Sequence, residues 1–422
     1  MAIFVETELG GLIDRIIDYR GKTPKKLKGV WTSFGIPALS AKNIKQGKIV
    51  NHGSIRYVNN DLYNRWMKVE VKKGDILMTS EAPLGETYYL KNDEKILLSQ
   101  RLFAIRSNEK KLNPHFLYYY FNTKSGKHEL LSRATGTTVG GIRQTALFKV
   151  KIRYPVDTVV QQQIAEVLAR YDDLIENNER RIKILEETAQ RLYTEWFVKF
   201  NFPGNKKSKM IDSGTEYGMI PEGWATNRLR DVTNYVRGCS YSSDEIDDYI
   251  GEYYIVNLKS FNRGGGFRFD GAKYYTGDIN ENQLLSEGDI VVAVTDMTND
   301  RAIIARPARI PEIKHRTTFS ADVVKIISDN LPNSFIYQLL SSYRFTETTK
   351  QKANGANVLH LKPDAILEYK ALIPTKELLN EFEAFCSKTT KEINKLIRQN
   401  DILTKTRDLL IPQLVTGRRY LK

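Results

Sequence analysis

Residues 12–21 read L-I-D-R-I-I-D-Y-R-G, and residues 229–238 read L-R-D-V-T-N-Y-V-R-G. The two stretches lie 217 positions apart, and further matches follow at offsets between 214 and 219. They include the Gly-Asp-Ile triplets at 74–76 and 288–290. A repeat this long indicates a duplicated domain, because solenoid repeats span only about 20–50 residues. We therefore expect two similar halves that hold two similar sites.

Each half has the same plan, a strand-rich globular region followed by one long helix. Short apolar alternations broken by turn residues are typical of strands, and they fill both globular regions. We expect a first domain at 1–156, a helix at 157–200, a polar linker and second domain at 201–375, and a second helix with a C-terminal tail at 376–422. The predicted fold class is α+β: two similar mixed α/β domains in a pseudo-two-fold repeat, separated by two long antiparallel helices.

The two long helices carry matching apolar stripes. From Ile164 to Trp196, and again from Phe382 to Leu414, core-type residues recur at alternating steps of four and three. This is the period of a coiled coil, although either stripe alone also fits a helix packed on its own domain. If the two helices pair antiparallel, the residue numbers of each pair of opposite residues add up to 578. The pairing sets Asn178 opposite Asn400, and a partnered core asparagine fixes register. Pro412 argues against the last turn of the second helix.

Charge is unevenly distributed along the 422 residues, whose net charge is +14. Residues 1–156 carry 27 Lys and Arg against 13 Asp and Glu, whereas residues 201–375 carry 21 against 22. A basic first half favours a polyanionic partner. The sequence has no apolar run long enough to span a membrane and no signal-peptide pattern, and its two cysteines lack metal-ligand spacing. These features predict a cytoplasmic protein with free thiols.

Two fragments resemble catalytic motifs. Asn113-Pro114-His115-Phe116 resembles a motif of amino-methyltransferases, but an Asn N-cap with Pro at the first helical position explains it equally well. Pro363-Asp364 with Glu368-Tyr369-Lys370 resembles a nuclease fragment, but three residues are too few to set both carboxylates around a metal. The sequence has neither a phosphate-binding P-loop nor metal-ligand histidine spacing. We expect no catalytic residue and no metal site.

Basic and small polar residues in the predicted loops are the candidate DNA contacts. Lys and Arg neutralise phosphates, and Asn, Thr and Arg can bond base edges. The first-half candidates are Arg20, Lys22, Lys25, Lys42, Asn43, Lys45, Arg133, Thr137, Thr138 and Arg143. The second-half candidates are Arg237, Ser240, Tyr241, Lys259, Asn262, Arg263, Lys352, Asn354 and Asn357. For any single residue the alternative is ordinary solvated loop charge.

Several motifs occur in one order over essentially the whole chain. They are Gly35-Ile36-Pro37-Ala38-Leu39-Ser40-Ala41-Lys42-Asn43-Ile44, the Gly-Asp-Ile triplets, Thr135-Gly136-Thr137, Gln161-Gln162-Gln163-Ile164-Ala165, Ile220-Pro221-Glu222-Gly223-Trp224 and Leu409-Leu410-Ile411-Pro412-Gln413-Leu414. In this order they resemble the DNA-specificity subunits of type I restriction-modification systems. The chain departs from the family at Val160-Gln161, where the family has Glu-Gln, and its first half lacks the Pro-x-Gly-Trp entry.

The resemblance implies two target recognition domains, each reading one half of a split DNA site. It also implies helices that space the domains and dock two modification subunits, which methylate adenine N6 with S-adenosylmethionine. Restriction subunits that use ATP and Mg would complete the complex, and this chain would be non-catalytic and hold no cofactor. Hydrophobic residues outside the stripe are the expected docking contacts: Leu174, Ile184, Phe197 and Val198.

Three alternatives remain open. A coiled-coil adaptor would explain the helices, and a tandem DNA-binding regulator would need no restriction-modification partners. A stand-alone enzyme would need an active site in one half or in both. The spacer expectation has a physical scale, because positions 164–196 span about 50 Å of helix. That length exceeds one turn of B-DNA, roughly 34–36 Å, so two readers could face one side of a duplex.

Overall fold

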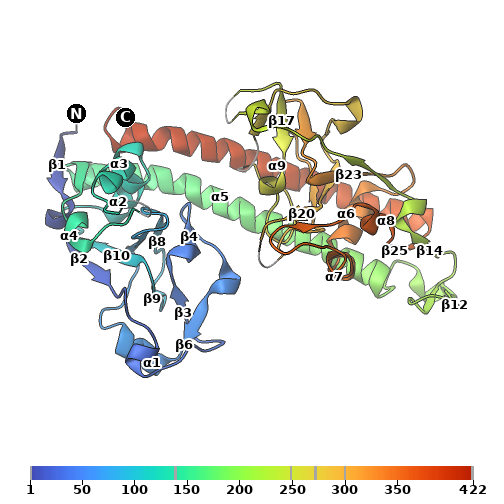
Figure 1. Cartoon of the computed structure of the whole chain (residues 1–422), viewed down its shortest axis with the longest axis horizontal. Coiled ribbons are helices and arrows are strands. Elements are labelled where there is room, and N and C mark those ends of the chain that lie inside the picture. Colours follow the sequence, from blue (N-terminus) through green and yellow to red (C-terminus); the bar gives the residue numbers. More distant parts are fainter. Residues whose placement is uncertain (1, 137–139, 248–249, 270–272, 299–300, 420–422) are drawn as a thin grey trace. The chain divides into compact units, whose positions relative to one another are not determined.

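The computed structural model describes residues 2–136, 140–247, 250–269, 273–298 and 301–419. The chain forms two units, Met1–Leu174 with Leu403–Lys422 and Ile175–Ile402. Its two longest helices, α5 (Thr158–Tyr193) and α9 (Lys376–Val415), each contribute to both units (Figure 1).

The first unit is built mainly of short strands and helices. Before α5 they are β1 (Phe4–Glu8), β2 (Ile13–Asp18), β3 (Ile36–Leu39), β4 (Ile44–Lys45), β5 (Lys48–Ile49), β6 (Arg56–Val58), α1 (Asn60–Trp66), β7 (Ile76–Thr79), β8 (Thr87–Tyr89), β9 (Leu97–Leu98), β10 (Leu102–Ser107), α2 (Pro114–Phe121), α3 (Lys124–Ser132), α4 (Gln144–Leu147) and β11 (Lys151–Pro155).

The second unit has a similar series. Before α9 its elements are β12 (Met210–Asp212), β13 (Met219–Pro221), β14 (Ala225–Arg228), β15 (Asn234–Arg237), β16 (Ile246–Asp247), β17 (Tyr253–Val256), β18 (Lys273–Tyr275), β19 (Ile290–Ala293), β20 (Thr295–Asp296), β21 (Pro307–Arg309), β22 (Thr317–Phe319), β23 (Val323–Ile327), α6 (Asn333–Ser341), α7 (Tyr343–Lys350), β24 (Leu359–His360), α8 (Asp364–Leu367) and β25 (Lys370–Ile373).

The two units share one topology. A four-stranded sheet has the order β2-β10-β7-β8 in the first unit and β15-β23-β19-β21 in the second. In both units a parallel pair lies in another sheet, β3 with β9 and β17 with β22. A helical pair also follows at matching places, α2 with α3 and α6 with α7. The expected fold class is confirmed: two similar mixed α/β domains with long antiparallel helices.

The repeated Gly-Asp pair forms the same turn in each unit. Gly74 and Gly288 have φ of +88° and +89°, a left-handed conformation that favours glycine. The carboxylate of Asp75 accepts a hydrogen bond from the backbone N–H of Lys72 at 2.9 Å. The carboxylate of Asp289 does the same for Ser286 at 2.8 Å. The turn thus needs both residue types, which explains why the pair recurs in the sequence.

In the second unit, α5 and α9 run antiparallel in the expected register. The Nδ2 of Asn178 donates to the Oδ1 of Asn400 at 2.9 Å. About five turns further along, in the π-helical turn that follows α5, the rings of Trp196 and Phe382 lie 5.9 Å apart between centroids. Both pairs obey the constant sum of 578, so the structure agrees with the predicted register at two layers.

In the first unit the same two helices meet in an apolar cluster. Ile164 and Leu168 of α5 share this cluster with Leu414 and, at its margin, Leu410. The C-terminal end then reaches the N-terminal strand. Gly417 lies so close to Phe4 that a methyl group in place of its hydrogen would sit 2.7 Å from the ring.

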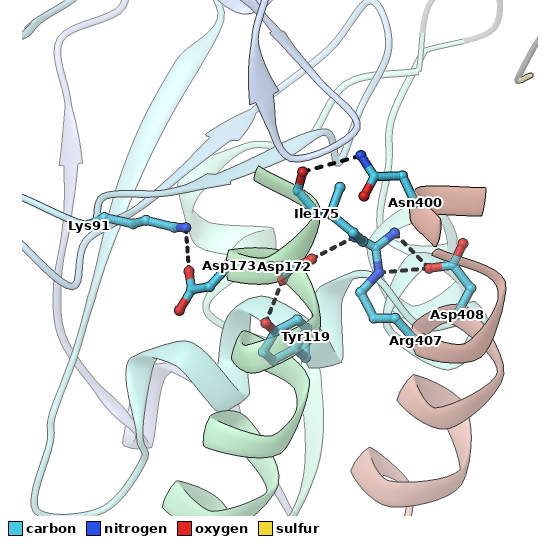
Figure 2. Close-up of polar contacts among 8 residues, drawn as sticks. All are labelled: Lys91, Tyr119, Asp172, Asp173, Ile175, Asn400, Arg407 and Asp408. Carbon is cyan, nitrogen blue, oxygen red and sulfur yellow. Dashed lines mark hydrogen bonds and ion pairs between the residues drawn. The ribbon is translucent and has the colours of Figure 1, made fainter. Parts of the chain in front are cut away.

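A polar network also joins the helices of the first unit, although Arg407 occupies a core-type position. The Nη1 of Arg407 lies 2.6 Å from one carboxylate oxygen of Asp172, and the hydroxyl of Tyr119 donates to the other at 2.5 Å (Figure 2). Burial, reinforced by Asp172, raises the pKa of Tyr119, so its hydroxyl stays protonated as a donor. Lys91 contacts Asp173 at 2.9 Å on the neighbouring residue of α5. The paired charges offset the cost of placing an arginine in the seam.

Three local expectations differ from the structure. α9 continues through Pro412 to Val415, because only one backbone donor is lost and tertiary packing holds the turn. The beginning of the region 201–375, expected to be a polar linker, contains the antiparallel pair β12–β13. The long first helix ends at Tyr193 and continues as a π-helical turn at Thr194–Val198.

Replacing one core asparagine should cost more than replacing both. Asn400→Leu leaves the amide of Asn178 without its partner, which should lower the free energy of unfolding by about 1–3 kcal/mol. The double substitution Asn178→Leu with Asn400→Leu should recover most of that loss, because an apolar pair then fills the layer. Urea unfolding followed by circular dichroism measures both. Losses that simply add would contradict the pairing.

Candidate nucleic-acid interface

In the first unit, two candidate loops meet at one end of the four-stranded sheet. β2 ends at Asp18, at the same end of the sheet as Thr79, the last residue of β7. Just beyond β7, Glu81 forms a β-bridge with Gly141, which belongs to the loop 133–143. The loop that follows β2 and the loop 133–143 therefore lie together.

The second unit repeats this placement. β15 ends at Arg237 at the end of the sheet where β19 also finishes. The next strand, β20, pairs with β24, and Asn354 bridges to His360 of β24. The loop after β15 and the loop 352–357 thus occupy the equivalent end of the second sheet.

Arg20 is mainly a structural residue. Its guanidinium forms a bidentate pair with Asp18 at 3.0 and 2.9 Å and lies 3.9 Å from the centroid of the Phe103 ring. Its Nη1 also donates to the carbonyl oxygen of Ile142 at 3.4 Å. Arg20 therefore ties the base of the first loop to the third loop rather than projecting freely.

Lys22 also has an internal partner. Its Nζ donates to the carbonyl oxygen of Trp66 at 2.7 Å and lies 4.4 Å from the centroid of the Tyr19 ring. Burial, together with the charge of Lys68, lowers the pKa of Lys22. Lys25, by contrast, is exposed on the short 3-10 turn of the same loop, so it is the better candidate for a phosphate contact.

Asn43 does not fit a direct DNA contact. It is 0% exposed, and its Oδ1 accepts bonds from the backbone N–H and the hydroxyl of Ser40 at 3.1 and 2.8 Å. Its Nδ2 donates to the hydroxyl of Ser54 at 3.2 Å. The prediction mistook a turn-forming amide for a surface one. Lys42 and Lys45, which flank the turn, are exposed and fit the predicted role.

The third loop of the first unit is mixed. Arg133 is half-buried and pairs with Glu129 at 3.3 Å. Arg143 is exposed at the start of α4. The predicted contacts Thr137 and Thr138 lie outside the described residues.

The candidates in the second unit are all exposed. They are Arg237, Ser240, Tyr241, Lys259, Asn262, Arg263, Lys352, Asn354 and Asn357. The amide of Asn262 also donates to the carbonyl oxygen of Phe267 at 3.1 Å, which fixes its own loop. The nine residues supply side chains of mixed chemistry rather than a basic surface.

The two interfaces differ strongly in charge. Residues 19–60 contain nine Lys and Arg and no Asp or Glu. The topologically equivalent stretch 238–280 contains four Lys and Arg against seven Asp and Glu. Electrostatic attraction to a phosphate backbone is therefore concentrated on the first unit.

Three of the four predicted docking residues are exposed apolar side chains: Leu174, Ile184 and Val198. Phe197 is not, since it is 4% exposed and packs on Trp224, Phe335 and Phe382. Phe197 lies in the π-helical turn Thr194–Val198, and this turn directs its side chain into the core. Sequence reasoning missed exposed apolar residues on α9, namely Phe385, Ile402 and Leu409. The criterion used for the first helix was an apolar residue outside the stripe. The same criterion applied to the second helix would have found these three residues.

Among the residues that the structure describes, no three His, Cys, Asp or Glu side chains gather closely enough to hold a metal ion. Likewise, none of the helices in the described part of the chain combines the length and apolar character needed to cross a bilayer.

A duplicated α+β chain with polar loops at equivalent ends of two sheets defines a two-site recognition protein. Residues 9–187 match the family model described as type I restriction modification DNA specificity domain. The type I restriction enzyme MjaIX specificity subunit of Methanocaldococcus jannaschii is 25% identical, over 98% of this chain and 96% of that one. The HindI specificity subunit of Haemophilus influenzae is 20% identical, over 83% and 87%.

One solved structure shows the same fold. The crystal structure of the type I restriction-modification S subunit from M. genitalium has a TM-score of 0.56 at 15% identity, over 98% of this chain and 96% of that chain. Residues 9–187 thus match the DNA-specificity domain family, and the chain is similar over nearly its whole length to a type I restriction enzyme specificity subunit.

Lys42 and Asn43 are neighbours, but replacing each should change a different property: DNA binding for Lys42 and stability for Asn43. Asn43→Ala removes a buried amide with several partners and should lower the free energy of unfolding by about 1–3 kcal/mol. Lys42→Ala should leave the free energy of unfolding within about 0.5 kcal/mol of the wild type. It should make the negative slope of log DNA affinity against log salt concentration shallower by about 0.9. Thermal unfolding and a salt titration of binding measure the two. A stable Asn43→Ala variant would contradict the structural role.

Proposed function

We propose that the chain is the sequence-reading subunit of a type I restriction-modification complex, in which each unit reads one half of a bipartite duplex DNA site. The observation that carries the proposal is one topology used twice, with polar loops at equivalent sheet ends. A shared scaffold with different loop residues suits two readers of different base sequences.

The two readers would divide the work unequally. The first, with nine cations and no acid between residues 19 and 60, would supply most of the salt-dependent attraction to phosphates. The second combines Ser240, Tyr241, Asn354 and Asn357 with few cations, so it would contribute mainly contacts to base edges.

The long helices would act as spacer and docking platform. The 36 residues of α5 correspond to about 54 Å of helix. Exposed Leu174 and Ile184 of α5, Val198 of the π-helical turn that follows it, and exposed residues of α9 would contact two modification subunits. Those subunits would bind S-adenosylmethionine and methylate adenine N6, and restriction subunits would use ATP and Mg. The present chain would bind DNA and position it, without a catalytic residue or cofactor of its own.

Exchange of one reader tests the proposal. Residues 1–156 are replaced by those of a relative with a different target, with Phe4 kept because Gly417 packs on it. The chain is expressed with its modification subunits, and methylated sites are mapped by sequencing the methylome. One half of the bipartite site should change while the other half and the gap stay the same.

The reciprocal exchange of residues 201–375 is the matched control, and it should change only the other half-site. Methylation that is unaltered by both exchanges would contradict the proposal. Specific DNA binding without any methylation would instead favour a tandem DNA-binding regulator.

A further inference from the structure

The loop between β2 and β3 exposes two large apolar side chains among cations. Phe34 is 81% exposed and Val30 is 74% exposed. Lys25 and Lys28 are exposed on the same loop, and no acidic residue occurs between residues 19 and 60. Large exposed apolar side chains on a stretch of chain that carries only basic charges are unlike an ordinary solvated loop.

The base of this loop is held firmly against α1. The Nζ of Lys22 donates to the carbonyl oxygen of Trp66 at 2.7 Å, and Nη1 of Arg65 donates to the carbonyl oxygen of Leu27. Gly29 allows a close approach, because a Cβ there would lie 2.8 Å from the side chain of Leu62.

The apolar tip is held as well. The N–H of Thr32 donates to the carbonyl oxygen of Tyr57 at 2.9 Å, and the hydroxyl of Thr32 donates to the carbonyl oxygen of Phe34 at 2.7 Å. Gly35 has φ of +124°, and a Cβ there would lie 2.5 Å from the carbonyl oxygen of Val58. The backbone that presents Phe34 is therefore ordered before anything binds, which lowers the entropic cost of binding.

Charge decides what can cover the tip. The exposed lysines of this stretch, which include Lys25, Lys28, Lys42 and Lys45, would repel a basic partner and attract a polyanion. Duplex DNA is a polyanion outside and stacked aromatic bases inside, and apolar side chains of DNA-binding proteins insert between base steps. One of the cations of this stretch, Arg56, lies with its guanidinium 5.4 Å from the centroid of the Trp31 ring.

We propose that Phe34, supported by Val30, is an apolar wedge that contacts and partly unstacks bases of the half-site read by the first unit, while the surrounding lysines hold the phosphates. This inference rests on the proposed DNA-reading function. The wedge would add sequence specificity, because base steps differ in how easily they unstack. The second unit has Gly251 at the equivalent distance before β17, and the exposed residue beside it is the aliphatic Ile250 rather than an aromatic one, so we place the stacking wedge in the first unit.

The test uses the full chain with its modification subunits and duplexes that carry the methylome-defined site. 2-Aminopurine replaces one base at a time across both half-sites, and its fluorescence rises where stacking is lost. The wild type should raise fluorescence at one step of the first half-site and at none of the second.

Phe34→Ala should abolish the rise and weaken binding roughly tenfold to a hundredfold, with an unchanged salt slope. Phe34→Trp should restore both the rise and the affinity. Val159→Ala, which truncates another exposed apolar residue, on α5, is the matched control and should behave like the wild type. Lys25→Ala with Lys28→Ala should lower the salt slope instead.

Wild-type fluorescence and affinity in Phe34→Ala would overturn the wedge while leaving the DNA-reading function intact. The wedge would equally be overturned if Phe34→Ala lost its modification subunits but still unstacked the base, because Phe34 would then be a protein contact. Failure of the wild-type complex to bind any duplex would overturn the proposed function and the wedge together.

Discussion

Two asparagine amides in a largely apolar seam fix which residues of the two long helices lie opposite each other. Between apolar side chains alone, one helix could slide past the other by a heptad at little cost, since leucine and isoleucine layers are nearly interchangeable. The hydrogen bond from Asn178 to Asn400 removes that freedom, because any slip would bury two unpartnered amides. In the first unit, Arg407 with Asp172 has a similar consequence, since a slip would strand a charge.

A fixed register matters because each recognition unit is assembled on these helices. α5 begins directly after β11, and in the first unit Leu414 packs in the same cluster as Ile152 of β11. In the second unit Phe382 of α9 packs on Phe335 of α6 through Phe197. The helices are thus part of each domain core, and the loops at the sheet ends inherit their placement from that packing.

Much of the architecture could be predicted because it depends on repeated patterns. The steps of four and three specified the helices, and the constant sum of 578 located the asparagine pair. The recurring Gly-Asp pair marked one turn in both halves, since its left-handed glycine and capping carboxylate are chemical necessities.

Individual surface residues could not be predicted so well. The sequence does not distinguish an asparagine that completes a turn, such as Asn43, from one that faces solvent. Nor does it reveal that the guanidinium of Arg20 is bonded to Asp18 and lies over the ring of Phe103. The prediction that Phe197 is exposed was wrong because the residue lies in a π-helical turn. Such a turn rotates the following side chains relative to the positions that a regular heptad assigns to them. Exposure of Phe34 depends on how its loop is anchored to α1 and Tyr57, which are distant in sequence.

The central claim is that two units of one chain read two separate segments of DNA. Hydroxyl-radical footprinting of the complex with its modification subunits, on a duplex that carries the methylated site, tests it most directly. We expect two short protected segments separated by a gap of weaker protection. Replacing Lys25, Lys28, Lys42 and Lys45 by alanine should weaken protection of one segment more than the other. A single protected segment, or equal weakening of both, would show that the two units do not read separate segments of DNA.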